Sequence, residues 1–331
     1  MNLLDIEHLR VDLRSRERRG APRTVIHDVS LTIAPGEAVG VVGESGSGKS
    51  MTVKAVMRLL PRRATVGGTL EFRGTSIPAM PGRDLARFRS QLVSMIYQDP
   101  RAHINPLRTI GDFLIEGVVA SGQMNRAEAL EAACTLLRDV GVNDPQRRLS
   151  QYPHQLSGGL LQRMMIVMAL LPSPELVLAD EPTTALDVTV QSEVMAILTE
   201  QIRERSVGLL FITHDLDLAA AVTDSLAVMH AGTVVERGPS ADIYAAPRHP
   251  YTAALLASRP SPTSVARPVS IPGRPVSAFE AGEGCAFASR CPYAIGQCRT
   301  ERPEPRTAGT RTVACHRSDE LEAVLAEGVR A

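Results

Sequence analysis

The segment Gly43–Ser50 restricts the fold of this 331-residue chain more than any other stretch. Its sequence, GESGSGKS, fits the pattern G-x-x-x-x-G-K-[ST] in full. It follows the apolar run Ala38–Gly43, which has the length and composition of a buried parallel strand, and a helical pattern begins at Lys49. A strand, a glycine-rich turn and a helix in this order predict a phosphate-binding loop in an α/β protein. A glycine-rich turn without a ligand is the alternative.

We call Gly43–Ser50 the phosphate loop. Its glycines allow backbone N–H groups to turn toward phosphate oxygens, and the following helix adds the positive end of its dipole. Lys49 is expected to reach the β- and γ-phosphates, and the Ser50 hydroxyl to ligate Mg²⁺. Of the 36 basic residues only Lys49 and Lys54 are lysines, which indicates that an arginine would not serve at position 49. The predicted nucleotide-binding residues of the loop are Gly43, Glu44, Ser45, Gly46, Ser47, Gly48, Lys49 and Ser50.

A pair of acidic residues, Asp180 and Glu181, ends a second apolar run. At the carboxyl end of a parallel strand, Asp180 is expected to hold Mg²⁺, directly or through water. Glu181 is then placed to polarise the attacking water as general base. Two acids after a strand also occur as a plain turn or helix cap, so this interpretation depends on the phosphate loop.

Four further motifs follow in order, and together with the phosphate loop and the acid pair they resemble the ATP-binding-cassette (ABC) ATPases over about residues 3–238. Gln98 resembles the glutamine of the Q-loop, Ser157–Gly159 the signature, Ala185-Leu186-Asp187 the D-loop, and His214 the switch histidine. The resemblance implies an α/β P-loop NTPase of ABC type, with a RecA-like core, an antiparallel β subdomain and a helical subdomain at about 99–171. Residues 1–238 would form this nucleotide-binding domain.

The resemblance also implies roles for these residues. Gln98 would sense the γ-phosphate and, with Ser50 and Asp180, contact Mg²⁺. His214 would contact the γ-phosphate and orient Glu181, so the predicted catalytic residues are Glu181, His214 and Gln98. The signature and the D-loop would bind the ATP held by an opposing subunit, which implies ATP sandwiched in a dimer; their predicted binding residues are Ser157, Gly158, Gly159 and Asp187.

The sequence departs from the family pattern in two places. Leu160 stands where the signature often has Gln, but that side chain is not the phosphate ligand. The family stacks adenine on an aromatic residue upstream of the loop, and residues 1–71 contain no Phe, Tyr or Trp. Leu13 or a nearby arginine is a candidate replacement, and no adenine-contacting residue is assigned.

The tail resembles the ATPases of oligopeptide/dipeptide importers. Residues 248–257 contain the HPYT segment of that group, and after a Pro- and Ser-rich linker (259–275) a cysteine module (284–316) follows within the extension 239–331. The resemblance implies a [4Fe–4S] cluster, and the irregular spacing of the four thiolates is compatible with one but does not by itself choose it. Zinc, or reduced or disulfide-linked thiols, are the alternatives. The predicted ligands are Cys285, Cys291, Cys298 and Cys315.

Composition excludes other classes of function. The longest apolar run, Met164–Leu171, has 8 residues, and the N-terminus has no apolar core of a signal peptide. The 36 basic residues balance 36 acidic ones and aromatics are scarce, which argues against nucleic-acid binding.

The resemblance therefore implies an ATP-hydrolysing subunit, peripheral on the cytoplasmic face of the membrane, that powers import of di- or oligopeptides. Its partners would be a second ATPase chain (a heterodimer is favoured), two permease subunits and an extracytoplasmic substrate-binding protein. Import of nickel or glutathione by the same machinery is an alternative. A soluble ABC ATPase acting on nucleic acid or ribosomes is a weaker one.

Overall fold

The computed structural model describes residues 1–14, 22–183, 187–259 and 270–330 of the chain. These residues form two compact units. Unit 1 contains residues 1–3, 33–38 and 73–212, and unit 2 contains residues 4–32, 39–72 and 213–331. These units are defined by contacts within the chain and do not correspond to the predicted domains 1–238 and 239–331, whose boundaries therefore stay predictions.

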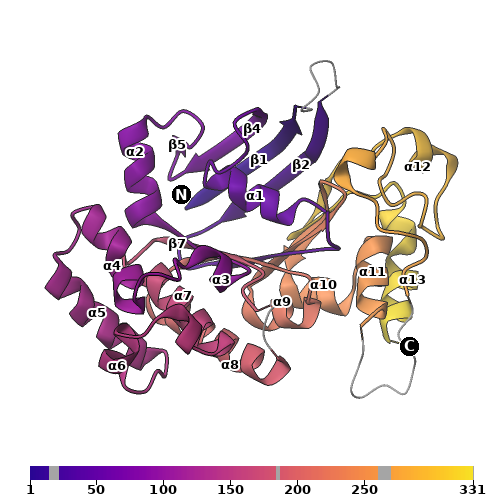
Figure 1. Cartoon of the computed structure of the whole chain (residues 1–331). Coiled ribbons are helices and arrows are strands. Elements are labelled where there is room, and N and C mark those ends of the chain that lie inside the picture. The colour runs from indigo at the N-terminus through magenta and orange to yellow at the C-terminus, as the bar shows by residue number, and fades with distance from the viewer. Residues whose placement is uncertain (15–21, 184–186, 260–269, 331) are drawn as a thin grey trace. The chain divides into compact units, whose positions relative to one another are not determined.

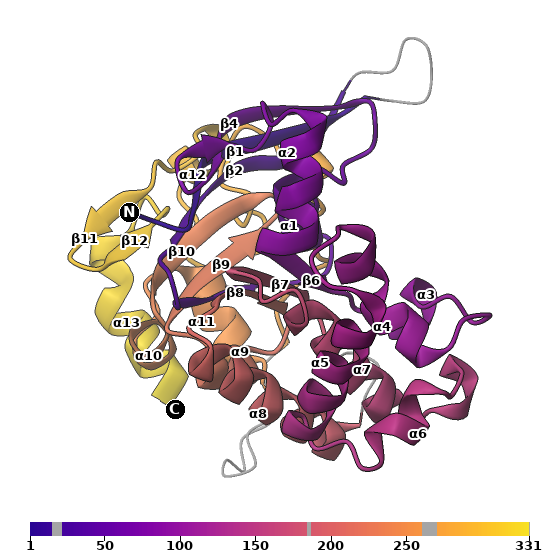
Figure 2. The same cartoon turned by 90° about the vertical axis from the view of Figure 1, so that its left-hand side faces the viewer.

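Unit 1 is built on the parallel strands β6, β7 and β8. Val93 of β6 pairs with Leu176 of β7, and Leu176 pairs with Gly208 of β8. Every residue of β7 and β8 is buried, as their uninterrupted apolar sequences predict. Helices α4, α5, α6 and α7 contact one another and form a helical group (Figure 2).

The elements of unit 1 have the following bounds. The strands are β5 (Thr75–Ser76), β6 (Val93–Ile96), β7 (Leu176–Asp180) and β8 (Gly208–Thr213). The helices are α2 (Gly82–Arg87), α3 (Pro100–His103), α4 (Ile110–Ala120), α5 (Arg126–Asp139), α6 (Pro145–Leu149), α7 (Gly158–Leu170) and α8 (Val188–Glu204), with a π-helical turn at Phe88–Leu92 and a 3₁₀ turn at Pro153–Gln155.

Unit 2 combines parallel and antiparallel pairing. The buried strand β3 runs parallel to β9, and β2 runs parallel to β10, whereas β1 with β4 and β9 with β10 are antiparallel. A hydrophobic core joins β3 and β9 to helices α9, α10 and α11. Phe287, from the cysteine module, lies in this core beside Tyr251 of α11, so the tail is packed into the unit. Helix α13 lies beside α11 (Figure 1).

The elements of unit 2 have the following bounds. The strands are β1 (Leu4–Leu13), β2 (Arg23–Ile33), β3 (Ala38–Val42), β4 (Ala64–Phe72), β9 (Ser225–His230), β10 (Thr233–Pro239), β11 (Arg306–Ala308) and β12 (Arg311–Val313). The helices are α1 (Lys49–Val56), α9 (Leu216–Val222), α10 (Ser240–Ala245), α11 (Pro250–Ala257), α12 (Gly296–Thr300) and α13 (Ser318–Arg330), with a 3₁₀ turn at Ala278–Glu280.

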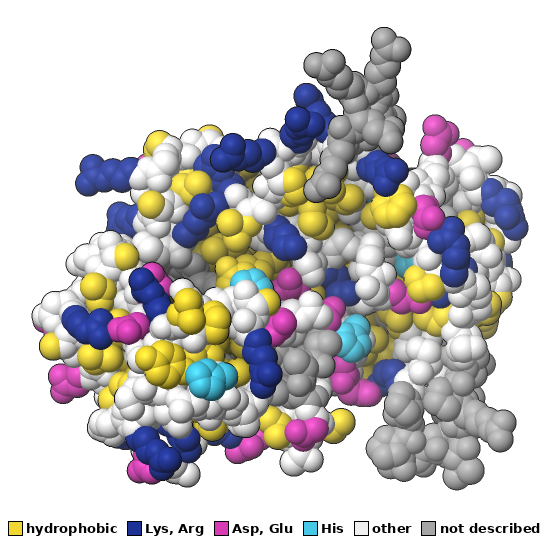
Figure 3. Space-filling view, in the orientation of Figure 1, with side chains coloured by type: hydrophobic (Ala, Val, Ile, Leu, Met, Phe, Trp, Pro, Cys, Tyr) yellow, Lys and Arg dark blue, Asp and Glu magenta, His cyan; other side chains and the backbone are white. Residues whose placement is uncertain are grey.

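Charged side chains of both signs lie on the surface, and the helices are those of a chain without long apolar runs. Lys and Arg side chains are spread over the face seen in Figure 3, with Asp and Glu side chains among them. Across the described parts of the chain, every helix is too short or too polar to span a bilayer.

A buried carboxylate, Glu236 of β10, fixes the start of α11. Its side chain accepts hydrogen bonds from the backbone N–H groups of Arg248 (2.9 Å) and His249 (3.0 Å), and it forms an ion pair with Arg311 of β12. Glu236 is fully buried, and the Arg311 side chain is 8% exposed. A buried pair of this kind is costly to break, because the remaining charge keeps no partner.

We expect Glu236→Ala to lower the free energy of unfolding by about 3–5 kcal/mol, since it leaves Arg311 buried without its counter-charge. A denaturant titration followed by circular dichroism measures this change. The control is Glu320→Ala, which breaks the ion pair with Arg317 at the surface; it should change stability little, because water screens an exposed pair. Equal effects of the two variants would contradict the assigned role of Glu236.

Candidate nucleotide-binding site

The phosphate loop connects β3 to α1 and is bounded by two glycines that no other residue could replace. Gly43 has φ 155°, and a Cβ on it would lie 2.0 Å from the carbonyl oxygen of Met229. Gly48, the N-cap of α1, has φ 105°, and its Cβ would lie 2.7 Å from the Met229 side chain. The loop is therefore pressed against β9, and this packing sets its course.

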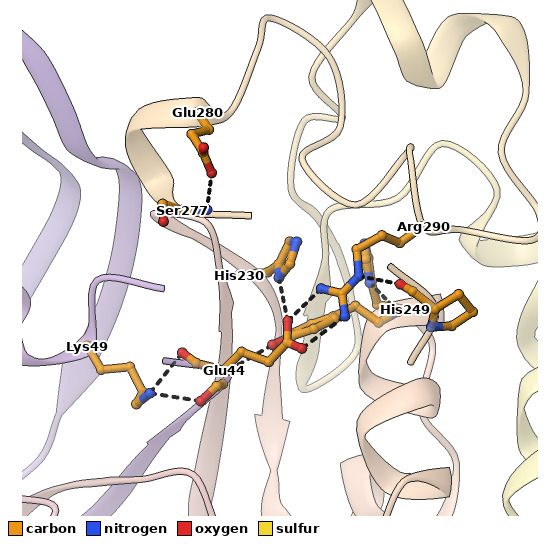
Figure 4. A network of polar contacts seen from close by, with 10 residues as sticks. Glu44, Lys49, His230, His249, Ser277, Glu280 and Arg290 are labelled. Atoms are coloured by element: carbon orange, nitrogen blue, oxygen red, sulfur yellow. Dashed lines mark hydrogen bonds and ion pairs between the residues drawn. The ribbon is translucent and has the colours of Figure 1, made fainter. Parts of the chain in front are cut away.

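Lys49 is turned back into the loop. Its side chain is buried, and Nζ donates hydrogen bonds to the carbonyl oxygens of Gly43 (2.8 Å) and Glu44 (3.1 Å) (Figure 4). The loop is closed further by the N–H of Gly232, which donates to the carbonyl oxygen of Ser47 at 2.8 Å. The Lys49 charge is thus held at the start of the helix, where phosphate oxygens are expected.

Glu44 connects the loop to the tail, which the sequence did not indicate. Its carboxylate accepts two hydrogen bonds from Arg290, at 2.7 and 2.9 Å, and its backbone N–H donates to the Tyr251 hydroxyl at 2.9 Å. His230 Nδ1 lies 3.8 Å from the same carboxylate. Burial raises the pKa of Glu44, but the hydrogen bonds and charge of Arg290 outweigh it, so the pKa is lowered overall.

The histidines behind this contact are neutral. Burial lowers the pKa of His230 to about 4 and that of His249 to about 3. His249 Nδ1 accepts a hydrogen bond from the Tyr251 N–H (3.0 Å) and caps α11. His230 lies against the rings of Tyr251 and Phe287. Burial also raises the pKa of the Tyr251 hydroxyl.

In unit 1 two of the predicted catalytic residues meet. Gln98, after β6, donates a hydrogen bond from Nε2 to Oε2 of Glu181 at 3.2 Å. Glu181 has φ 45°, a left-handed conformation that is strained for a residue with a side chain, and its N–H donates to the carbonyl oxygen of Ile212. Asp180, which directly precedes Glu181, is the last residue of β7, and its side chain is buried.

The predicted signature residues line a hollow in unit 1. Ser157 caps α7, and Asp187 caps α8 by accepting a hydrogen bond from the Val190 N–H at 3.1 Å. The hollow has a volume of about 530 Å³ and is lined by Ser157, Gly158, Gly159, Asp187 and the side chains of Arg148 and Arg163, among others. Glu193 also lines the hollow and pairs with Arg163 at 2.6 Å, so the two arginines are balanced by Glu193 and Asp187. The N-termini of α7 and α8 are the groups that could hold an anion there.

The remaining predicted residues are placed as follows. His214 directly follows β8 and is exposed. Of the D-loop, Ala185 and Leu186 lie outside the described residues. The phosphate loop and His214 belong to unit 2, whereas Gln98, the acid pair, the signature and Asp187 belong to unit 1, so the combined catalytic and Mg²⁺ sites stay predictions.

The four predicted metal ligands face one small cavity of about 20 Å³, which Cys285, Cys291, Cys298 and Cys315 line together with His249 and Phe287. All four are free thiols. Burial raises the pKa of Cys285, Cys291 and Cys315, and the charge of neighbouring cysteines raises it further. Among the described residues, however, no three His, Cys, Asp or Glu side chains are grouped as a metal ion requires. The structure therefore does not support the predicted cluster or zinc site beyond this shared cavity.

Two family models match the chain. The model described as "ABC transporter" covers residues 26–184, including the phosphate loop and the acid pair. The model described as "Oligopeptide/dipeptide transporter, C-terminal region" covers residues 235–298. The second match contains the start of α11 and the first three cysteines of the module.

Relatives match over nearly the whole chain. The oligopeptide transport ATP-binding protein OppD of Salmonella typhimurium is 40% identical, with 95% of this chain and 93% of the relative covered. The dipeptide transport ATP-binding protein DppD of Haemophilus influenzae is 38% identical, with 96% of both covered.

Solved structures share the fold. An ATP-binding subunit of an ABC transporter is 30% identical with a TM-score of 0.58, over 73% of this chain and 91% of that one. A dimeric ATP-binding cassette bound to ADP and Pi has a TM-score of 0.61 at 24% identity, over 72% of this chain and 98% of that one.

Gly159 provides a test of the hollow. A Cβ at this position would lie 2.7 Å from Val190 Cγ1, so we expect Gly159→Ala to lower the free energy of unfolding by about 1–3 kcal/mol through overpacking. Val190→Ala in the same chain should restore most of the loss. The control is Gly117→Ala in α4, where a Cβ meets nothing within 4 Å; it should leave stability unchanged or raise it by up to about 1 kcal/mol. Denaturant titrations compare the three variants, and a Gly159→Ala variant as stable as Gly117→Ala would count against the close contact.

Proposed function

Since this chain belongs to the ABC transporter ATPases, in the group of the oligopeptide and dipeptide transport ATP-binding proteins, we propose that it binds and hydrolyses ATP to power peptide import through membrane partners. The observation that carries this proposal is the near-complete match to OppD and DppD, at 40% and 38% identity. The built phosphate loop, with Lys49 buried at the start of α1, is consistent with that role.

We assign hydrolysis to a small set of residues. Lys49 and the loop amides bind the phosphates, and Glu181 polarises the attacking water as general base. The hydrogen bond from Gln98 to Glu181 supports a role for Gln98 in orienting that base. His214 contacts the γ-phosphate. Ser50, Asp180 and Gln98 would hold Mg²⁺, which would supply positive charge to the phosphates.

A second ATPase subunit completes each site in this proposal. Ser157, Gly158, Gly159 and Asp187 would bind the ATP of that subunit, and their position together at one hollow, at the N-termini of α7 and α8, supports this. A related but different chain is the favoured partner, so the ATPase pair would be a heterodimer. The two permeases and the extracytoplasmic binding protein make contact with the cargo, and this subunit lies on the cytoplasmic face of the membrane.

For the cysteine module we propose a [4Fe–4S] cluster held by Cys285, Cys291, Cys298 and Cys315. Four cysteines around one cavity, of which Cys298 is buried and the other three are partly buried, support this donor set. Zinc is the second candidate. Four ligands of one zinc ion must converge to about 2.3 Å from a single point, whereas each thiolate of a cubane binds a separate iron. The shared cavity does not choose between the two, and the cluster is proposed on the resemblance of the module to that of the oligopeptide/dipeptide importers. We assign the bound group a structural role, ordering a segment poor in apolar residues.

Glu181→Gln should reduce ATP hydrolysis by about 10²–10⁴-fold, because the amide cannot accept the proton of the attacking water. ATP binding should be retained, since the variant keeps its shape. The matched control is Glu175→Gln, at the start of the same chain segment, where the carboxylate pairs with Arg73 at 2.7 Å. It should hydrolyse ATP at the wild-type rate. Steady-state phosphate release and equilibrium ATP binding measure both effects, and unchanged hydrolysis in Glu181→Gln would remove Glu181 as the base.

Anaerobic purification tests the cysteine module. We expect iron and acid-labile sulfide in equal amounts, with visible absorption that disappears when an iron chelator is added. Cys298→Ser should lose this absorption, whereas Cys134→Ser, which changes a buried cysteine in α5, should keep it. Stoichiometric zinc without sulfide would overturn the cluster.

The cargo requires a separate experiment. Purifying the subunit with its permeases and binding protein, and identifying the ligand of the binding protein by mass spectrometry, distinguishes peptides from nickel or glutathione.

A further inference from the structure

Arg290 links the cysteine module to the phosphate loop. Its side chain is only 4% exposed, although the residue stands directly before Cys291. Nη1 and Nη2 donate to the two carboxylate oxygens of Glu44, at 2.7 and 2.9 Å, and Nε donates to the carbonyl oxygen of Pro272 at 2.8 Å (Figure 4). All three guanidinium nitrogens therefore donate a hydrogen bond, and the ammonium group of a lysine could not reproduce this planar, two-pronged contact.

Further contacts join the tail to the same loop. The hydroxyl of Tyr251, in α11, accepts the hydrogen bond from the Glu44 N–H. A Cβ at Gly46 would lie 3.7 Å from Oγ of Ser277. Both the side chain and the amide of Glu44 are thus held by residues more than 200 positions later in the chain.

The position of Glu44 bears directly on Lys49. The Glu44 carbonyl oxygen accepts a hydrogen bond from Nζ of Lys49 at 3.1 Å, and the same oxygen accepts one from the Ser47 N–H at 3.3 Å. Contacts therefore run from Arg290 to Glu44, and from Glu44 to the Lys49 ammonium group and the Ser47 N–H, which are expected to bind the phosphates. A displacement of Glu44 would move both groups together.

We propose that Arg290 is a positioning residue for nucleotide binding: through its two hydrogen bonds to Glu44 it holds the phosphate loop in the shape that accepts ATP. This inference rests on the proposed role of the loop in ATP binding. It assigns the cysteine module a function at the nucleotide site, since the module supplies the residue that orders the loop.

The test is ATP binding to the full-length chain by isothermal titration, with Mg²⁺ present. Arg290→Ala should raise the Kd for ATP about tenfold or more, within the usual range of coupling between distinct sites. Arg290→Lys should retain part of the affinity, because it keeps the charge but loses the fork. The matched control is Arg299→Ala, which changes an exposed arginine directly after Cys298 and should leave the Kd unchanged.

A double-mutant cycle separates positioning from a general loss of tail structure. If Arg290 acts through Glu44, Glu44→Gln should raise the Kd itself, and adding Arg290→Ala to it should raise the Kd no further. Additive effects, or an unchanged Kd in Arg290→Ala, would overturn the proposal. Iron and sulfide contents are measured for each variant. If the Kd for ATP rises only in those variants that have lost iron and sulfide, the proposed role of Arg290 through Glu44 is also overturned. Failure of the wild-type chain to bind ATP would instead overturn the proposed function.

Discussion

The ion pair between Glu44 and Arg290 is the contact on which the arrangement of unit 2 depends. It joins a residue of the phosphate loop to a residue beside the cysteine cavity, and both side chains are withdrawn from solvent. Around it lie neutral His230 and His249, the Tyr251 hydroxyl and the ring of Phe287. The charges of the pair compensate each other, so a mainly apolar interface between loop and tail can include them without an unpaired charge.

Sequence patterns predicted the central elements because those elements are buried on all sides. The run that forms β3 and the run that leads to Asp180 in β7 are apolar, and every residue of both strands is buried. Strands β1 and β4 were not predicted, since they pair with each other as partly exposed antiparallel strands in which charged residues interrupt the apolar ones. The helix predicted from Lys49 begins at that residue and ends at Val56.

Some residues of the candidate site are indicated by local sequence patterns, and others are found only in the folded structure. The phosphate loop could be located from the spacing of its residues, and the acid pair could be interpreted only together with that loop. Arg290 and Tyr251 could not, because their partner Glu44 lies more than 200 residues away and no local pattern records such a distance. The only available signal was weak: an arginine next to a cysteine and a tyrosine in the HPYT segment. The left-handed backbone of Glu181 likewise has no signature in the sequence.

The separation of Glu44 and Arg290 along the chain also matters during synthesis. A ribosome produces the phosphate loop early, and 246 positions separate Glu44 from the arginine that pairs with it. Strands β9 and β10, Tyr251 and Phe287 are made in the same late portion. The phosphate loop is therefore made before its contact with Arg290 can form, and it is tied to the tail only after Arg290 has been synthesised.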